Sequence, residues 1–121
     1  MKVLFVQEQP QLLTALKMTF ANKGYDMVVC NGVLNPHSVI EAVHPDIVIA
    51  DITKASGITY VEEAKCKNIP VMVLSSSGDL NNLQDAFDKG ADDYISFPLS
   101  YSELVLRVGI LTKGRRVKNA A

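Results

Sequence analysis

Five short apolar runs alternate along the chain with five stretches whose apolar residues recur at helical spacing. The short runs suit buried strands, and the longer periodic stretches suit amphipathic helices. Strands are expected at 3–6, 27–30, 47–50, 70–74 and 94–96, and helices at 10–23, 36–43, 57–67, 80–89 and 100–111. Right-handed crossovers between parallel strands cover both faces of such a sheet with helices. We therefore predict an α/β fold, a three-layer doubly wound (βα)5 sandwich with strand order 2-1-3-4-5.

Turn and capping residues set the ends of these elements. Pro10 and Pro36 suit the first turn of a helix, and Asn35 is a favourable N-cap for the second helix. Gly24 is expected to stop the first helix. The stretch 100–103, Ser-Tyr-Ser-Glu, reads as a capping box at the start of the last helix.

Length and composition point to one folded domain. The 121 residues, 48% hydrophobic and 21% charged, can form one core but not two. The net charge of −1 gives no general attraction for nucleic acids or membranes. No stretch suits a signal peptide or a membrane span, and Cys30 and Cys66 lack metal-binding spacing. We expect reduced thiols and a soluble, cytoplasmic protein.

Asp51 directly follows the central apolar run and is the residue around which the other polar positions gather. The carboxyl ends of parallel strands are where open α/β sheets place their chemistry. With the predicted strand order, the ends of the first and third strands lie side by side at the switch point. Gln7 and Glu8 should therefore converge on Asp51, while Ser75 and Phe97 arrive from the fourth and fifth strands.

These positions resemble the receiver domain of two-component response regulators, which has a CheY-like, flavodoxin-like fold. The resemblance spans nearly the whole chain and rests on four segments in the right order: 3–10, 45–51, 70–75 and 90–99. It implies that Asp51 accepts a phosphoryl group from a histidine kinase. It also implies a Mg²⁺ ion held by Glu8, Asp51 and the backbone carbonyl of Thr53, because oxygen ligands and a cation neutralise developing charge. Ser75 and Tyr94 are then the switch residues.

Two positions depart from the family pattern and weaken this expectation. Gln7 is a neutral amide at the first acidic position, able to reach a metal only through water, and Phe97 stands where a lysine is usual. A bond to a charged group is worth about 1.5–3 kcal/mol. At about 1.36 kcal/mol per tenfold, the missing lysine costs roughly tenfold to more than a hundredfold in the reaction or the switch. The loop after Asp51 also differs, with Ala55 where proline is usual and Gly57 two residues early.

A finer resemblance concerns the dimer face of OmpR/PhoB-type transcriptional regulators. In those proteins the fourth helix, fifth strand and fifth helix pair across a two-fold axis through reciprocal salt bridges. Glu103 and Arg107 are also an i,i+4 pair within one helix, which is the simpler interpretation. The usual basic partner on the fourth helix falls near Leu83, whose apolar side chain can instead favour a hydrophobic interface. The expected homodimer face comprises Leu83, Asp92, Asp93, Glu103 and Arg107.

The last residues are basic, with Lys113, Arg115, Arg116 and Lys118 close together. A solvated tail is favoured over a phosphate-binding arm. By resemblance, the same stretch looks like the start of a linker to a winged-helix DNA-binding domain. We predict a receiver domain over 1–113 and a basic tail over 114–121, with DNA reached only through an output domain.

The leading functional hypothesis is an atypical receiver domain that is not an enzyme. It acts through dimerisation and protein contacts on an output, most simply a transcriptional one, with weak or no phosphorylation of Asp51. A conventional phospho-receiver served by a histidine kinase and Mg²⁺ is the alternative. A flavodoxin-like or nucleotide-binding module is opposed by the stretch 7–10, which has no glycine and carries an acidic residue. A hydrolase is poorly supported, since no nucleophile–base pair is readable.

Overall fold

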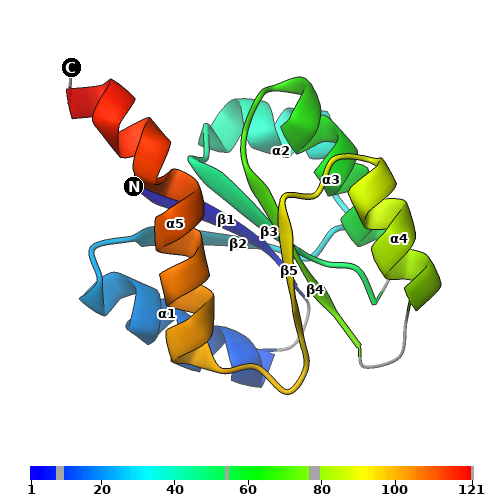
Figure 1. The fold of residues 1–121 in the computed structure, drawn as a ribbon, viewed down its shortest axis with the longest axis horizontal. Helices are drawn as coiled ribbons and strands as arrows, with labels where there is room; N and C mark the ends of the chain where they lie inside the picture. The colour runs from blue at the N-terminus through cyan, green and yellow to red at the C-terminus, as the bar shows by residue number, and fades with distance from the viewer. Residues whose placement is uncertain (8–9, 54, 77–79, 121) are drawn as a thin grey trace.

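The computed structural model describes residues 1–7, 10–53, 55–76 and 80–120, and these residues form a sheet covered by helices on both faces (Figure 1). The strands are all parallel and lie in the order β2-β1-β3-β4-β5. This arrangement confirms the predicted doubly wound fold and strand order. The elements are β1 (Lys2–Val6), α1 (Pro10–Asn22), β2 (Asp26–Cys30), α2 (Pro36–Val43), β3 (Ile47–Asp51), α3 (Ala55–Cys66), β4 (Val71–Ser75), α4 (Leu80–Asp88), β5 (Asp93–Ser96) and α5 (Tyr101–Ala120).

Two apolar clusters, one on each face of the sheet, make up the core. Alternate strand residues point to opposite faces. Leu4 and Val48 therefore pack with α2, α3 and α4, whereas Phe5 and Ile49 pack with α1 and α5. Figure 1 shows the same division, with α1 and α5 together on one side of the sheet. Because both faces are covered, the central strands β1, β3 and β4 are almost entirely apolar.

The predicted helix ends at 24 and 35 are confirmed. Gly24 takes a φ of +84°, which a residue with a side chain rarely adopts, and Tyr25 N–H then donates to the carbonyl of Phe20 at 2.9 Å. At the start of α2, Asn35 Oδ1 accepts a hydrogen bond from Ser38 N–H at 3.1 Å. The turns from α1 into β2 and from β2 into α2 are thus fixed by local hydrogen bonds.

Two helices differ in extent from the sequence prediction. Helix α3 begins at Ala55, two residues before the predicted start at Gly57, so the connection from β3 is short. Helix α5 continues to Ala120 rather than ending at Leu111. Gly114 costs about 1 kcal/mol in a helix, but the lysines and arginines beside it are good helix formers, so the helix continues through the basic segment.

Tyr60 of α3 forms a hydrogen bond with the loop between β2 and α2. Its side chain is fully buried, and its hydroxyl donates to the carbonyl of Leu34 at 2.9 Å. Burial, followed by a hydrogen bond with Cys30, raises the pKa of Tyr60 above its ordinary value. The phenol therefore stays protonated and keeps its donor role at all physiological pH values.

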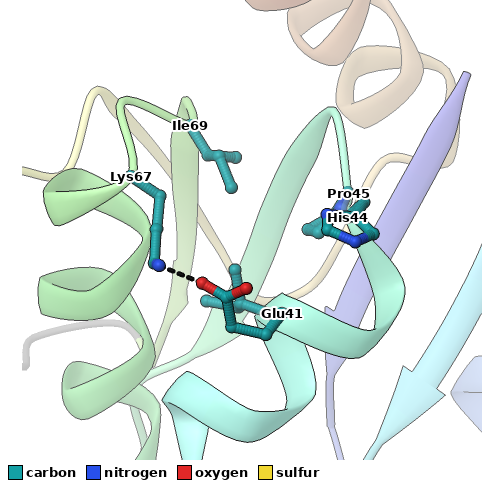
Figure 2. A pocket seen from close by; sticks show the side chains of 6 residues that line it. Glu41, His44, Pro45, Lys67 and Ile69 are labelled. Carbon is teal, nitrogen blue, oxygen red and sulfur yellow. Dashed lines mark hydrogen bonds and ion pairs between the residues drawn. The ribbon is translucent and has the colours of Figure 1, made fainter.

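A small cavity of about 240 Å³ lies between the carboxyl ends of α2 and α3. Figure 2 shows Glu41 of α2 reaching across to Lys67, which follows α3, and the two side chains form an ion pair. The hydrogen bond from Lys67 lowers the pKa of Glu41 and in turn raises the pKa of Lys67. Because His44 and Ile69 on its wall precede β3 and β4, this cavity lies at the amino-terminal edge of the sheet, away from Asp51.

Within the described ranges, no helix combines the length and apolar content that crossing a bilayer requires.

Candidate functional site

The carboxyl-terminal edge of the sheet brings the expected polar residues together. Asp51 is the last residue of β3, Gln7 follows β1, and Ser75 ends β4. The register pairs Val6 with Ala50, so the residues that follow each of them, Gln7 and Asp51, are neighbours. The convergence predicted for these strand ends is confirmed for Gln7 and Asp51. Glu8, the other acidic candidate, lies outside the described residues.

Both oxygens of the Asp51 carboxylate accept hydrogen bonds from uncharged donors. Gln7 Nε2 donates to Oδ2 at 2.6 Å. Thr53 donates to Oδ1 twice, from its backbone N–H at 2.9 Å and from its hydroxyl at 2.7 Å. Hydrogen bonds to an ionised group are short and stronger than neutral ones. The carboxylate is thus stabilised by amide and hydroxyl dipoles contributed by this chain.

Among the described residues, Gln7 offers no direct ligand to a cation at Asp51. Gln7 is almost fully buried, 5% exposed, and presents an N–H to Asp51, and an N–H cannot ligate a metal ion. Magnesium prefers carboxylate, carbonyl and water oxygens. In the described part of the chain, no three His, Cys, Asp or Glu side chains lie close enough together to hold a metal ion. Among the described residues, the expected ligands are Asp51 and the backbone carbonyl of Thr53, and the Mg²⁺ site stays a prediction.

The first turn of α3 presses against the backbone of Asp51. A Cβ placed on Gly57 would lie 2.1 Å from the carbonyl oxygen of Asp51 and 2.8 Å from its carbonyl carbon. Only a glycine fits there. Helix α3 begins at Ala55, soon after Asp51, and its first turn meets the end of β3 at Gly57.

The two expected switch residues occupy different environments. Ser75 is buried, and its hydroxyl lies 3.4 Å from that of Ser96, its register partner on β5. Tyr94 is 42% exposed and packs edge-to-face on Phe87 of α4, with ring centroids 5.9 Å apart. The aromatic ring of Tyr94 therefore points outward over α4 rather than into the site.

Phe97 contributes to the core instead of the site. It follows β5, and its N–H donates to the carbonyl of Ser75 at 2.9 Å. Its half-buried side chain packs with Leu99 and Tyr101 against the cluster on the α1–α5 face. The peptide bond to Pro98 is cis. No charged side chain from this position reaches Asp51, since a phenyl ring stands where a lysine would.

Three of the expected dimer-face residues form a network within one chain. Arg107 Nη1 donates to both carboxylate oxygens of Asp93, at 2.9 and 3.0 Å. Its Nε donates to Glu103 Oε1 at 3.0 Å. These bonds, with that to Asp93 first, raise the pKa of Arg107. Ser100 caps α5 by accepting a hydrogen bond from Glu103 N–H at 3.3 Å, which is one half of the predicted capping box. The Glu103 carboxylate, which would supply the other half, accepts a hydrogen bond from Arg107.

The other two expected dimer-face residues point elsewhere. Asp92 accepts a hydrogen bond from Val71 N–H at 2.9 Å and lies 3.7 Å from Lys65 of α3. Leu83 is partly buried and packs against the core on the α2–α4 face. On the expected dimer face, the α4–β5–α5 surface therefore presents Asp93, Arg107 and the Phe87–Tyr94 pair.

Sequence reasoning missed two polar contacts near the site. Ser96 meets Ser75, and Asn82 of α4 donates from Nδ2 to the carbonyl of Ile52 at 3.4 Å. The alternation of β5 could have placed Ser96 on the same face as Tyr94, yet it gives no partner for its hydroxyl. No sequence motif includes Asn82, so its contact with Ile52 could not be predicted.

Comparison with known proteins identifies the family. A family model described as the response regulator receiver domain matches residues 3–109. Among curated proteins, the transcriptional regulatory protein KdpE of Mycobacterium tuberculosis is 30% identical over 109 residues, covering 88% of this chain and 48% of KdpE. The DNA-binding dual master transcriptional regulator RpaA of Synechocystis is 24% identical over 127 residues, covering 99% of this chain and 53% of RpaA.

Solved structures give the same fold. The receiver domain of the Francisella response regulator 1452 superposes with a TM-score of 0.80 at 28% identity, covering 94% of this chain and 98% of that one. The receiver domain of NtrX from Brucella abortus gives a TM-score of 0.76 at 20% identity, covering 92% and 98%. The chain spans about half the length of the curated relatives it matches.

Proposed function

Because this chain belongs to the response regulator receiver domain family, we propose that it is an atypical receiver, one that acts through protein contacts with little or no phosphoryl transfer to Asp51. Its curated relatives are transcriptional regulators, and we propose a transcriptional output here too. Receiver domains are generally signalling domains rather than enzymes, and we assign this chain no enzymatic activity. The cytoplasmic location expected from the sequence stays a prediction.

The observation that carries this proposal is the hydrogen-bonded state of Asp51. Gln7 and Thr53 supply three hydrogen-bond donors to its two oxygens, and these donors draw negative charge from the carboxylate and so lower its nucleophilicity. Phe97, packed into the core, offers no ammonium group for the acceptor or the phosphoryl oxygens. Both features lower the nucleophile's reactivity without removing it from the strand end.

Mg²⁺ is the cofactor that receiver domains typically use at this position. When bound, it neutralises charge on the phosphoryl donor. We propose that this chain binds Mg²⁺ more weakly than a receiver with carboxylates at both acidic positions, because Gln7 is neutral and bonds Asp51. A histidine kinase is a partner only if Asp51 retains phosphoryl acceptance.

We expect acetyl phosphate with Mg²⁺ to leave the intact mass of the chain unchanged. The reason is the bonded state of Asp51 together with the missing lysine. The measurement is intact-mass spectrometry over time, with Asp51→Ala treated in parallel as the control. A stable gain of one phosphoryl group that is absent from Asp51→Ala contradicts the proposal and makes the chain a conventional phospho-receiver.

The α4–β5–α5 face is our proposed homodimer surface, as in the OmpR/PhoB-type regulators that the sequence resembles. Phe87 and Tyr94 supply an exposed aromatic pair on it. Arg107 already bonds Asp93 and Glu103 of its own chain, so a trans salt bridge exchanges one partner for another and adds little affinity. The aromatic pair is therefore the expected anchor, with the charges fixing the register.

Truncating the aromatic anchor should weaken the dimer. We expect Phe87→Ala to raise the dimer dissociation constant roughly tenfold or more, since an interface anchor contributes more than about 1.4 kcal/mol. Sedimentation equilibrium measures this constant, and Lys17→Ala on exposed α1 serves as the control. A wild-type chain that stays monomeric at millimolar concentration, or an unchanged constant in Phe87→Ala, contradicts this surface.

The division at residue 113 also stays a proposal. We propose that 1–113 is the receiver unit and that the basic stretch 114–121 is the start of a linker toward an output domain. The half-length coverage of the curated relatives supports this assignment. In such a protein, DNA contacts belong to the output domain and not to this chain, whose net charge is −1.

A further inference from the structure

A groove of about 510 Å³ runs between α1 and α5. It is separate from the site at Asp51, and its α5 wall is different from the Asp93–Arg107 network. The walls are mostly apolar, and two lysines are among the lining residues. Its lining includes Lys23, which follows α1, and Val105, Leu106, Gly109, Ile110 and Lys113 of α5.

Two large apolar side chains beside the groove are exposed without serving the core. Leu106 is 64% exposed and Ile110 is 66% exposed. The core-facing residues of α5, Leu104 and Val108, lie on the opposite side of the helix and are fully buried. Leu106 and Ile110 are four residues apart and therefore neighbours on one ridge. An apolar ridge beside an apolar groove marks a surface suited to a partner.

Gly109 at the groove wall has no explanation within this domain. A glycine inside a helix costs about 0.8–1 kcal/mol relative to alanine. At Gly57 close backbone contact demands this residue, but at Gly109 the nearest atom to an added Cβ is the Tyr25 hydroxyl, 3.7 Å away. That is ordinary van der Waals contact, so the fold would accept a side chain. The glycine instead keeps the groove open and lets another backbone approach α5 closely.

The charge on the groove is positive at one end. Helices α1 and α5 both return antiparallel to the strands, so their carboxyl ends lie at the same edge of the sheet. Lys23 follows α1 and Lys113 lies far along α5, which places both exposed ammonium-bearing side chains toward that end. An occupant with carboxylates there, and apolar residues along the rest, complements the groove.

We propose that this groove receives an amphipathic helix of a partner protein, with acidic residues at the end that meets Lys23 and Lys113. Helix-in-groove recognition uses anchors at i, i+3, i+4 and i+7 spacing, which match the ridge of Leu106 and Ile110. The backbone of the bound helix passes closest to α5 at Gly109. The proposal uses neither Asp51 nor the Phe87–Tyr94 pair, so it stands or fails independently of the proposed function.

The test is a titration of the full 121-residue, ¹⁵N-labelled chain with a synthetic helical peptide. The probe is a capped 18-residue peptide with leucines at helical spacing and glutamates at one end. We expect saturable amide shifts confined to α1 and α5 around the groove. Gly109→Met fills the groove and should weaken binding at least tenfold while the fold is retained, because methionine is a better helix former. The double variant Lys23→Glu, Lys113→Glu should lose roughly threefold to thirtyfold through its two exposed charges.

Ala21→Met is the matched control, since Ala21 is an exposed α1 position that does not line the groove. It should bind the peptide like wild type. Unchanged binding in Gly109→Met, shifts centred on another face, or equal binding of a peptide with lysines in place of glutamates each overturn the proposal. Self-association without peptide that is lost in Gly109→Met also overturns it, because the occupant is then a second copy of this chain.

Discussion

Gly57→Ala should destabilise the domain by about 3 kcal/mol, the upper end of the usual cost of overpacking. The added methyl group would lie 2.1 Å from the carbonyl oxygen of Asp51, which is backbone and cannot rotate away. Either α3 shifts or the end of β3 moves, and both disturb the bonds that hold Asp51. For a domain of this size, the melting temperature should fall by roughly 10 °C. Thermal unfolding followed by circular dichroism measures the change.

Gly109→Ala is the matched control because both glycines lie in helices and only one is crowded. Helix propensity alone predicts stabilisation of about 0.8–1 kcal/mol at either position. At Gly109 the new Cβ meets nothing closer than 3.7 Å, so this gain should be observed. Opposite signs in the two variants identify close approach as the cause. A Gly57→Ala variant that melts at or above the wild-type temperature shows instead that the short β3–α3 connection yields without cost.

Gln7→Asp should exchange a stabilising bond for a repulsion that Mg²⁺ relieves. Without Mg²⁺, the variant loses a hydrogen bond to a charged group, worth about 1.5–3 kcal/mol, and places a second carboxylate beside Asp51. A cation that binds only the folded state restores about 1.4 kcal/mol when its concentration is ten times its dissociation constant. We expect the melting temperature of Gln7→Asp to rise with Mg²⁺ while that of wild type changes little.

Gln7→Leu separates the effect of the lost hydrogen bond from the effect of the added carboxylate. It removes the same hydrogen bond but adds no carboxylate, so it should be destabilised and insensitive to Mg²⁺. Acetyl phosphate treatment of Gln7→Asp should also raise the yield of phosphorylated Asp51 at least tenfold, measured by intact mass against Gln7→Asp, Asp51→Ala. Equal Mg²⁺ stabilisation of wild type and Gln7→Asp rules out the amide as the cause of weak cation binding.

The sheet and the position of Asp51 could be predicted from the sequence because buried strands and amphipathic helices have different patterns of apolar residues. Strands such as 47–50 are apolar at every position since helices cover both faces. Gln7 and Asp51 could be brought together in the same way, because strand order and parallel register fix which strand ends meet. These are properties of the backbone, and a pattern of residue types is sufficient to predict them.

Partners of side chains were harder to predict because a pattern gives a face but not a bond. Arg107 bonds Asp93 and Glu103 of its own chain, although the same three residues also suit a contact between chains. Asp92 directly precedes Asp93, yet its side chain contacts Val71 and Lys65 rather than Arg107. The sequence showed that Phe97 replaces a lysine, but only the tertiary structure shows that its side chain packs against the buried cluster on the α1–α5 face.

Because α5 is continuous to Ala120, it fixes the rotation about its axis at its far end as well as the distance to that end. Each helical residue advances by 1.5 Å and turns by about 100°. Any group attached at the far end of this helix therefore has its direction fixed by residue count. One residue inserted after Lys113 rotates that group by about a quarter of a turn, whereas seven return it nearly to its starting angle and move it about 10 Å outward. The number of residues in the helix therefore sets both the distance and the orientation of an attached group, and each inserted residue changes both.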